Sequence, residues 1–357
     1  MKVYLKFFSL IYLRSLFYVF LIMTSLAFIL NLLSELDFFR EINVEINFPI
    51  FLALLNSPSM IFEMFPFIFL LATQLFFIKL FENKEIEILK YSGLKNSKII
   101  FFLSIISLIC GLFVSFVFYN FSSNLKNIYL ELKSNYTNDG KYLAVITKNG
   151  LWIKDKFQNT TFIINSKKIE NNFLKGNFIT EFDEEFNVKR NIKSEKIDIT
   201  LNNWKIYDAK VYEKNEYKDF AIINLQTNFD YKRIQTLYSN LSSLNIFELF
   251  ELRDNYIKLN YSITDINLQL LKLVSYPIYL ILMTVLSSVI MFNIKRTNSP
   301  TFKISIGLFF SVIIYYVYNF FQVLGSTERL PLMVSIFVPL IILTIVNNFM
   351  LFKINDK

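Results

Sequence analysis

A short charged stretch at residues 81–98 separates two long apolar segments of the chain and reads FENKEIEILKYSGLKNSK. Its first half has helical spacing, because apolar residues follow Glu82 and Glu85 at the intervals of a helix face. Gly93 then supplies a residue suited to a helix C-cap. The spacing predicts a helix over residues 82–92, held between two membrane spans, where a soluble partner can apply force.

The composition is that of a polytopic membrane protein. The 357 residues are 54% hydrophobic, include 41 Phe and have a mean hydropathy of +0.41, which is more apolar surface than a soluble domain needs. Six segments reach the roughly 20 residues that cross a bilayer. They are predicted at about residues 8–33, 59–81, 99–121, 268–294, 304–323 and 332–352.

The distribution of Lys and Arg in the short loops predicts the orientation. One side of the predicted spans carries Lys2, Lys6, Lys84, Lys90, Lys95, Lys98, Lys295, Arg296, Lys303, Lys353 and Lys357. The first loop on the other side, expected at residues 35–57, is acidic. Both termini and the 82–92 helix are therefore predicted to be cytoplasmic, and the long polar block between the third and fourth spans to lie across the membrane.

This polar block, residues 122–262, begins and ends with helical patterns and has short β-type runs between them. The runs lie at residues 145–147, 151–153, 161–164, 178–180, 197–200, 204–207 and 220–223, with turn signals at 149–150, 175–177, 183–185 and 201–203. Evenly spaced short strands predict an all-β sandwich or jelly roll, followed by an amphipathic helix near residues 243–261. Such a domain is either a rigid spacer or a groove that holds an acyl chain or docks a partner's sheet edge.

Several kinds of chemistry have no residues to support them. The chain contains no His, and Cys110 is its single cysteine, which excludes Ser/His/Asp and Cys/His catalysis, His metal sites and an intramolecular disulfide. It lacks a GxxxxGK[ST] phosphate loop and is not expected to hydrolyse ATP by itself. The net charge of +8 is typical of cytoplasmic loops and headgroup contacts, and no nucleic-acid-binding module accompanies it.

Two charged residues lie near the predicted outer ends of spans. Glu63 is either solvated at the membrane interface or a polar group that lines a cavity between helices. Lys272 either extends to the headgroup region or attracts an anionic headgroup on the outer side.

Four local motifs, in order along the chain, carry a family resemblance. The segment 83–94, NKEIEILKYSGL, resembles a coupling segment of the form S-E-L-x-x-[LM]-[RK]-A-S-G-[VI], and Asn56-Ser57-Pro58 with Phe65-Pro66 resembles L-P…F-P. Residues 150–155, GLWIKD, resemble G-L-W-L-[RK]-D, and Tyr315-Tyr316 through Asn319 with Leu330-Pro331 resembles Y-Y-x-x-N…L-P. Together they make the chain similar to the lipopolysaccharide-export permeases LptF and LptG over essentially its whole length, and Gly-Leu-Trp favours LptG.

The resemblance implies an α-helical polytopic protein of the Gram-negative inner membrane, with six transmembrane helices and an inserted all-β, jelly-roll-like periplasmic domain. Residues 1–121 and 263–357 would form the membrane part, and residues 122–262 the periplasmic domain with its flanking helices. The implied partners are a second, LptF-like permease chain, a cytoplasmic LptB-like ATPase dimer and periplasmic LptC/LptA-like bridge proteins of β-jelly-roll fold. Lipopolysaccharide is the implied cargo. ATP and Mg²⁺ would be bound by the ATPase, and no cofactor is expected in this chain.

The same resemblance suggests site residues. Glu85 matches the family acid that pairs with an Arg of the ATPase. Secondary candidates for coupling are Glu82, Glu87 and Leu89. One departure concerns the outer end of the first span, where LptG-like members can carry a Lys that meets the lipid's phosphates and this chain has Asn31. Either the headgroup is held elsewhere or the native lipid is less phosphorylated. The lipid-contact candidates are Asn31, Glu35, Arg40, Glu63 and Lys272.

Two other function classes predict different sequence features. A permease of a different ABC system, such as one that releases lipoproteins, would differ in span count and have a larger α/β domain. A membrane-embedded enzyme acting on lipids would need convergent polar catalytic residues at the membrane face.

Overall fold

The computed structural model describes most of the chain and divides it into two compact units. The described residues are 3–42, 44–91, 93–134, 136, 151–157, 159–170, 172–213, 216–231, 234, 240–258, 261–293 and 299–355. One unit comprises Met1–Lys126 and Thr264–Lys357, and the other comprises Asn127–Ile263. The sequence placed the corresponding limits at residues 121/122 and 262/263.

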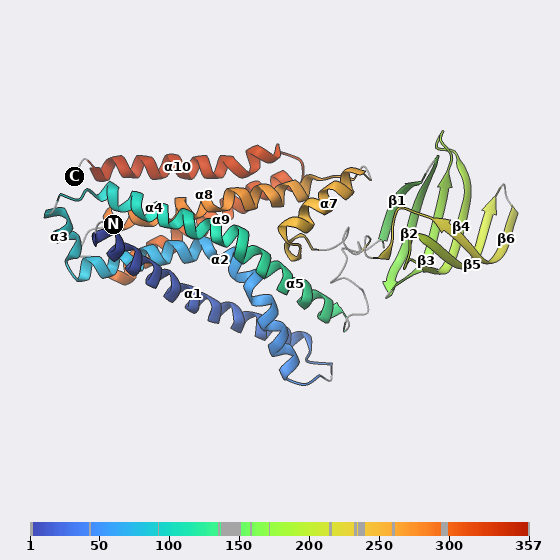
Figure 1. Ribbon diagram of the computed structural model, residues 1–357, viewed down its shortest axis with the longest axis horizontal. Helices are drawn as coiled ribbons and strands as arrows, with labels where there is room; N and C mark the ends of the chain where they lie inside the picture. The colour runs from blue at the N-terminus through green and yellow to red at the C-terminus, as the bar shows by residue number, and fades with distance from the viewer. Residues whose placement is uncertain are drawn as a thin grey trace. The chain divides into compact units, whose positions relative to one another are not determined.

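The first unit is built from helices long and apolar enough to cross a membrane, and the described residues contain six of them. They are α1 (Val3–Phe38), α2 (Asn47–Glu82), α4 (Asn96–Phe113) with the π-helical turn η1 (Val114–Phe118) and α5 (Tyr119–Ser134), α8 (Thr264–Asn293), α9 (Pro300–Ser326) and α10 (Leu332–Asn355) (Figure 1). The six predicted spans are therefore confirmed, and so is the helical continuation of the third span.

The second span begins earlier than predicted. α2 starts at Asn47, so much of the segment expected as a loop over residues 35–57 is helical. Proline signals misled the prediction here, because Pro is tolerated in a first helical turn and inside membrane helices. Pro66 removes the N–H that would pair with the Phe62 carbonyl, and the Tyr276 hydroxyl of α8 donates to that carbonyl instead.

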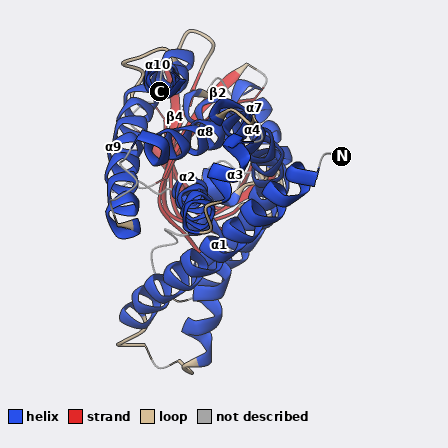
Figure 2. Cartoon of the chain, turned by 90° about the vertical axis from the view of Figure 1, so that its left-hand side faces the viewer, coloured by secondary structure: helices blue, strands red, loops and turns tan. Residues whose placement is uncertain are grey.

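The two most enclosed spans are α2 and α8. In their most apolar stretches 72% and 78% of the residues are buried, whereas in that of α9 17% of the residues are buried. Figure 2 shows α2 in the middle of the helices, with α1, α8 and α9 around it. A close approach holds α4 to α8 at Gly111, where an added Cβ would lie 3.0 Å from the Pro277 Cα. The exposed surface of α9 is therefore left to lipid or to another chain.

Four buried hydroxyl groups meet inside this unit, one from each of α1, α2, α4 and α8. The Tyr12 hydroxyl oxygen lies 2.9 Å from that of Ser107, 3.2 Å from that of Thr284 and 3.3 Å from that of Thr73. Ser107 and Thr284 are 2.8 Å apart, and all four residues are 0% exposed. The hydrophobic effect does not drive membrane helices together, because the surrounding lipid is as apolar as their side chains. Interhelical hydrogen bonds of this kind help to hold them together instead. The hydroxyl cluster therefore links four spans at one point.

Replacing Tyr12 with Phe is expected to destabilise the membrane unit modestly. The remaining hydroxyls keep partners, since Thr73 donates to the Phe69 carbonyl and Thr284 to the Leu280 carbonyl. No buried group is left without a hydrogen bond, so the loss should be about 0.6–1.7 kcal/mol. Thermal unfolding of the purified protein in detergent measures it. Tyr18→Phe on the exposed face of α1 is the matched control, and equal melting temperatures for the two variants would contradict the role of the cluster.

The second unit contains one antiparallel sheet in which the described strands follow one another in sequence order (Figure 1). The strands are β1 (Leu151–Phe157), β2 (Thr160–Glu170), β3 (Phe173–Phe182), β4 (Val188–Asp198), β5 (Asn203–Glu213) and β6 (Glu216–Gln226). The inserted β domain is thus confirmed, and its described strands follow the simple up-and-down order of a meander.

A buried apolar row crosses the sheet and explains its register. Ile153 pairs with Ile164, Ile164 with Ile179, Ile179 with Ile192, and Ile192 with Val211. Because side chains alternate between the faces of a strand, a slip of one residue would expose the whole row. The alternation along the sequence therefore specifies both the strands and their pairing.

The local predictions for this unit mostly agree with the structure. Turns at residues 183–185 and 201–203 are present, but the predicted turn at 175–177 is wrong. Gly176 lies within β3 with a φ of 63°, close against the side chain of Lys167, so it bends a continuous strand. The predicted strand at 145–147 and turn at 149–150 lie outside the described residues.

The predicted amphipathic helix is also present, as α7 (Ile246–Lys258) after the short turn η2 (Leu241–Ser243). Asn245 and Glu248 form a reciprocal capping box: the Glu248 N–H donates to Asn245 Oδ1 at 3.0 Å, and the Asn245 N–H donates to Glu248 Oε2 at 2.8 Å. Such a pair satisfies two donors at a helix start. Leu249 and Leu252 are fully buried, whereas Phe247 is 80% exposed.

Candidate functional site

The charged stretch between the second and third spans forms a sharp corner. α2 ends at Glu82, and the short helix α3 (Glu85–Tyr91) begins three residues later. Lys84 between them has a φ of 59°, a left-handed conformation that ends one helix before the next begins. The predicted helix over 82–92 is therefore too long at its start, because Glu82 belongs to α2. Gly93 has a φ of 83°, as expected of a glycine that follows a helix.

This geometry separates the acids that looked alike in the sequence. Glu82 is exposed at the end of α2, whereas Glu85 and Glu87 are half-buried in the first turn of α3. Glu85 Oε1 accepts a long hydrogen bond, 3.4 Å, from Asn83 Nδ2. Its Oε2 is shielded from solvent and has no hydrogen-bond partner among the described residues. The side chain of Leu89 lies outside the described residues.

Ile86 anchors the same helix, since its side chain is 2% exposed. An unsatisfied, partly shielded carboxylate is unfavourable unless a cation or a donor reaches it. Glu85 is therefore the acid of this corner that is best prepared for a charged partner.

A second set of contacts ties the end of α2 to the start of α9. The buried Gln74 side chain donates from Nε2 to the Lys303 carbonyl at 2.8 Å. The Lys303 ammonium lies 5.1 Å from the centre of the Phe81 ring, within the range of a cation–π contact. Gly307 makes this approach possible, because a Cβ there would collide with the Gln74 side chain. These contacts join α2 to α9 on the side of the corner.

At another place in the membrane unit, α2, α8 and α9 enclose a polar pocket of about 230 Å³. Its lining residues are Glu63, Pro66, Lys272, Tyr276, Tyr279, Tyr315, Tyr318, Asn319 and Gln322. Glu63 and Lys272 are far apart in the sequence, but both line this pocket in the folded chain. Lys126 of α5 is close enough for its charge to interact with both of them.

Sequence reasoning did not single out Lys126 or Gln322, and it used Tyr315 and Asn319 of α9 only as parts of a family motif. Lys126 lies on the helical continuation of the third span. A cation just beyond the end of an apolar span could have been recognised in the sequence as a candidate for the polar pocket. Asn319 and Gln322 are three residues apart and so share a helix face, but the pocket that they line with residues of α8 becomes visible only in the folded chain.

The other predicted lipid-contact residues do not line this pocket. Asn31 is 5% exposed and binds α2 through three hydrogen bonds: it accepts from Asn56 Nδ2 at 2.8 Å and donates to Ser57 Oγ at 3.3 Å and to Met60 Sδ at 3.8 Å. Glu35 is 1% exposed, and Arg40 is exposed after the end of α1. In this conformation Asn31 packs α1 on α2 with its polar groups occupied. Clusters of three or more His, Cys, Asp or Glu able to hold a metal ion are absent from the described part of the chain.

Comparison with known proteins identifies the family. The family model described as "Lipopolysaccharide export system permease LptF/LptG" matches residues 11–353, which is nearly the entire chain. A search of curated proteins finds no significant match. The matching model covers both permeases, so the preference for LptG stays a prediction. The fold agrees with the match, since six apolar helices and an inserted β unit are both present. The chain belongs to the LptF/LptG family of permeases of the lipopolysaccharide export system.

Proposed function

We propose that this protein is the permease subunit of an ATP-driven lipopolysaccharide exporter. It extracts the lipid from the outer leaflet of the inner membrane and passes it to a periplasmic bridge. The observation that carries the proposal is the family match over residues 11–353. Because the sequence has no phosphate loop, a separate cytoplasmic ATPase dimer binds ATP and Mg²⁺ and supplies the energy.

The proposal includes an orientation and a set of partners. The excess of Lys and Arg in the short loops supports cytoplasmic termini and a cytoplasmic α3. The β unit then lies in the periplasm and meets bridge proteins of similar β fold. A second, LptF-like permease chain completes the cavity for the lipid, which is consistent with the largely exposed surface of α9.

In this mechanism the α2–α3 corner receives the movement of the ATPase. Glu85 pairs with a cation of the ATPase, and the Gln74–Lys303 contact passes the displacement to α9. Glu82, Glu87 and Leu89 would surround that contact. On the lipid side, Glu63 and Lys272 act at the polar pocket, and Asn31, Glu35 and Arg40 near the outer end of α1.

The alternative is the permease of another lipid-releasing or lipoprotein-releasing ABC system. Such a permease would carry a larger α/β domain outside the membrane. The six described strands of the inserted unit and their meander order favour the lipopolysaccharide exporter.

Reconstitution tests the proposed function. The full-length protein, a second six-span permease and an ATPase encoded with it would be placed in proteoliposomes that contain lipopolysaccharide. We expect transfer of lipopolysaccharide to a soluble bridge protein only when ATP and all three chains are present. Omitting ATP is the control. Release of a lipidated protein in place of lipopolysaccharide, or transfer without ATP, would contradict the proposal.

A further inference from the structure

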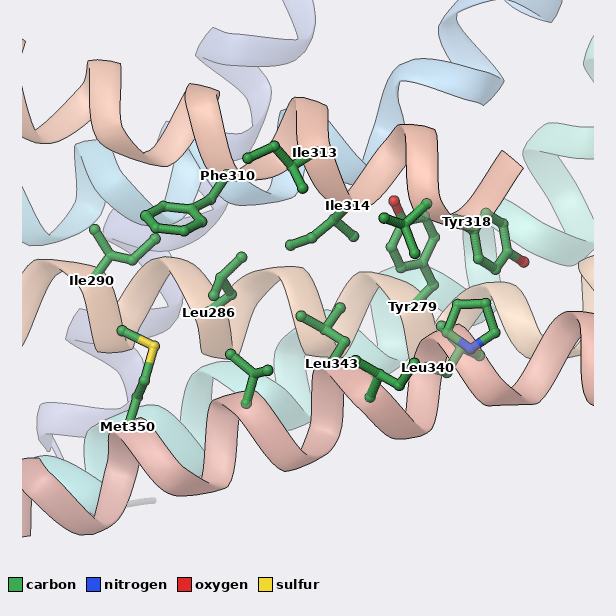
Figure 3. A pocket seen from close by; sticks show the side chains of 14 residues that line it. Tyr279, Leu286, Ile290, Phe310, Ile313, Ile314, Tyr318, Leu340, Leu343 and Met350 are labelled. Atoms are coloured by element: carbon green, nitrogen blue, oxygen red, sulfur yellow. The ribbon is translucent and has the colours of Figure 1, made fainter. Parts of the chain in front are cut away.

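An apolar cavity of about 260 Å³ lies between α8, α9 and α10. Figure 3 shows the side chains that line it, with Ile290 and Met350 toward one end and Tyr279 and Tyr318 toward the other. Protein interiors are close-packed and contain few voids larger than a water molecule. A cavity of this size between three spans leaves space into which one of them can move.

The wall that α9 contributes to this cavity is loosely packed. Leu286 and Ile290 of α8 are each 2% exposed, whereas Phe310 and Ile313 of α9 are each 43% exposed. α9 also has the smallest buried share among the six described spans. Sparse apolar contacts are typical of elements that move, so α9 is the wall of the cavity that can be displaced with the fewest contacts broken.

The C-terminal end of α9, in contrast, is held closely by two neighbouring helices. Gly325 is buried there, and an added Cβ would lie 2.8 Å from Ser335 Cβ of α10 and 2.9 Å from Leu268 Cδ1 of α8. Carbon atoms in favourable contact are about 3.5–4.0 Å apart, so a larger residue would force the helices apart. This end of α9 is therefore a fixed point.

The N-terminal end of α9 is joined to α2. Gln74 Nε2 donates to the Lys303 carbonyl, and the Gln74 side chain occupies the space that a Cβ of Gly307 would take. Gln74 is 0% exposed, and its Oε1 has no hydrogen-bond partner among the described residues. An unpaired amide oxygen inside a membrane protein is unfavourable, so stability alone does not explain this amide.

Between these two points α9 is built as one straight rod. Sharp helix kinks occur mostly at prolines and π-bulges, and α9 is continuous α-helix whose single proline, Pro300, is its first residue. Gly307 and Gly325 are 18 residues apart, which at about 1.5 Å per residue gives roughly 27 Å. The cavity-lining stretch from Phe310 to Tyr318 lies between them. A displacement at Gly307 therefore swings this stretch about Gly325.

We infer that α9 is a lever, which Gln74 of α2 moves at Gly307, which pivots at Gly325, and which closes the apolar cavity against α8 and α10. The inference rests on the proposed function, which supplies the ATP-driven movement of the α2–α3 corner. Tyr318 of α9 lines both the apolar cavity and the polar pocket. A swing that closes the cavity therefore also changes the shape of the pocket proposed to contact the exported lipid.

Filling the cavity tests the lever, because it separates stability from transport. Leu343→Phe places a larger side chain on the α10 wall and should raise the melting temperature by a few degrees, as cavity filling commonly does. In the reconstituted exporter the same variant should lower ATP-dependent lipid transfer at least fivefold, because α9 meets the added ring before its swing is complete. Ile345→Phe, at a 62% exposed position of α10 that does not line the cavity, should change neither quantity.

Gln74→Met removes the joint while keeping its bulk. Met is unbranched and similar in volume to Gln, so it fills the space beside Gly307 without donating to the Lys303 carbonyl. The ATPase should co-purify as with the unchanged protein and hydrolyse ATP at a similar rate, while lipid transfer falls at least fivefold. The measured quantity is the number of ATP molecules hydrolysed per lipid transferred, which a purely structural role of Gln74 would leave unchanged.

Three outcomes would overturn the lever. They are full transfer by Leu343→Phe, equal loss of transfer in Leu343→Phe and Ile345→Phe, and an unchanged ratio of hydrolysis to transfer in Gln74→Met. Val346→Phe, at an exposed position of the same wall, takes the place of Leu343→Phe if that variant melts at a lower temperature. Absence of transfer by the unchanged protein would contradict the proposed function, whereas full transfer by a cavity-filling variant contradicts the lever alone.

Discussion

Glu85→Ala is expected to weaken the association of the permease with its ATPase by roughly 30-fold, a loss of about 2 kcal/mol. Truncating one partner of a desolvated charge pair costs about 2–5 kcal/mol, and the lower end applies because Glu85 is only half-buried. Its shielded Oε2 has no partner within the described chain, so an arriving cation gains a full interaction there. Co-purification of the ATPase with a tagged permease from membranes measures the effect.

Glu82→Ala is the matched control for this prediction. Glu82 has the same charge and lies three residues away, but it is exposed at the end of α2. An exposed ion pair contributes about 0–1 kcal/mol, so ATPase recovery should fall little. Both variants should melt at the temperature of the unchanged protein. Unchanged ATPase recovery together with unchanged lipid release in Glu85→Ala would remove Glu85 from the coupling contact.

Trp204→Ala is expected to unfold the β unit or bring it close to unfolding. Trp204 is 0% exposed, pairs with Leu225 across β5 and β6, and donates from Nε1 to the Phe229 carbonyl at 2.7 Å. Removing a buried Trp costs about 3–5 kcal/mol, a large part of the roughly 5–15 kcal/mol that stabilises a domain. Limited proteolysis of the full-length protein should then produce rapid cleavage between residues 127 and 263.

The chain offers a matched control in its other tryptophan. Trp152 lies on β1 of the same sheet and is 55% exposed, so Trp152→Ala should leave the proteolysis pattern nearly unchanged. The chain has two tryptophans, and Trp152→Phe leaves Trp204 as the only indole fluorophore, which should emit at short wavelength. Equal resistance of Trp204→Ala and Trp152→Ala to protease would show that the sheet does not depend on the buried indole.

Local patterns in the sequence were sufficient for most secondary structure. The strands and α7 follow from hydrophobic alternation and helical spacing, which are properties of neighbouring residues. The errors occurred where a local signal had a non-local explanation. Gly176 bends a strand whose neighbours on both sides keep it paired. Pro66 was correctly placed inside the second span, but the sequence could not show that Tyr276, more than two hundred positions away, donates to the carbonyl that Pro66 leaves without a helical partner.

The candidate site could be predicted only in part. Glu85 was identified through a motif, and the structure adds that one of its oxygens has no partner. The two membrane-embedded candidates Glu63 and Lys272 were identified singly, as charges in apolar surroundings. Their common pocket, the nearby charge of Lys126 and the apolar cavity beyond Tyr279 depend on how α2, α5, α8, α9 and α10 pack, and no spacing in the sequence encodes that packing.

By itself, the sequence determined that this protein has six membrane spans and an inserted β unit, because span length, hydropathy and strand alternation are local quantities. It also showed no GxxxxGK[ST] phosphate loop, and this is why ATP binding by a separate chain is part of the proposed function. The tertiary structure decided which charged residues act together. Glu82 and Glu85 differ because Lys84 turns the chain between them, and Glu63 and Lys272 share a pocket because α2 and α8 pack side by side in the centre of the membrane unit.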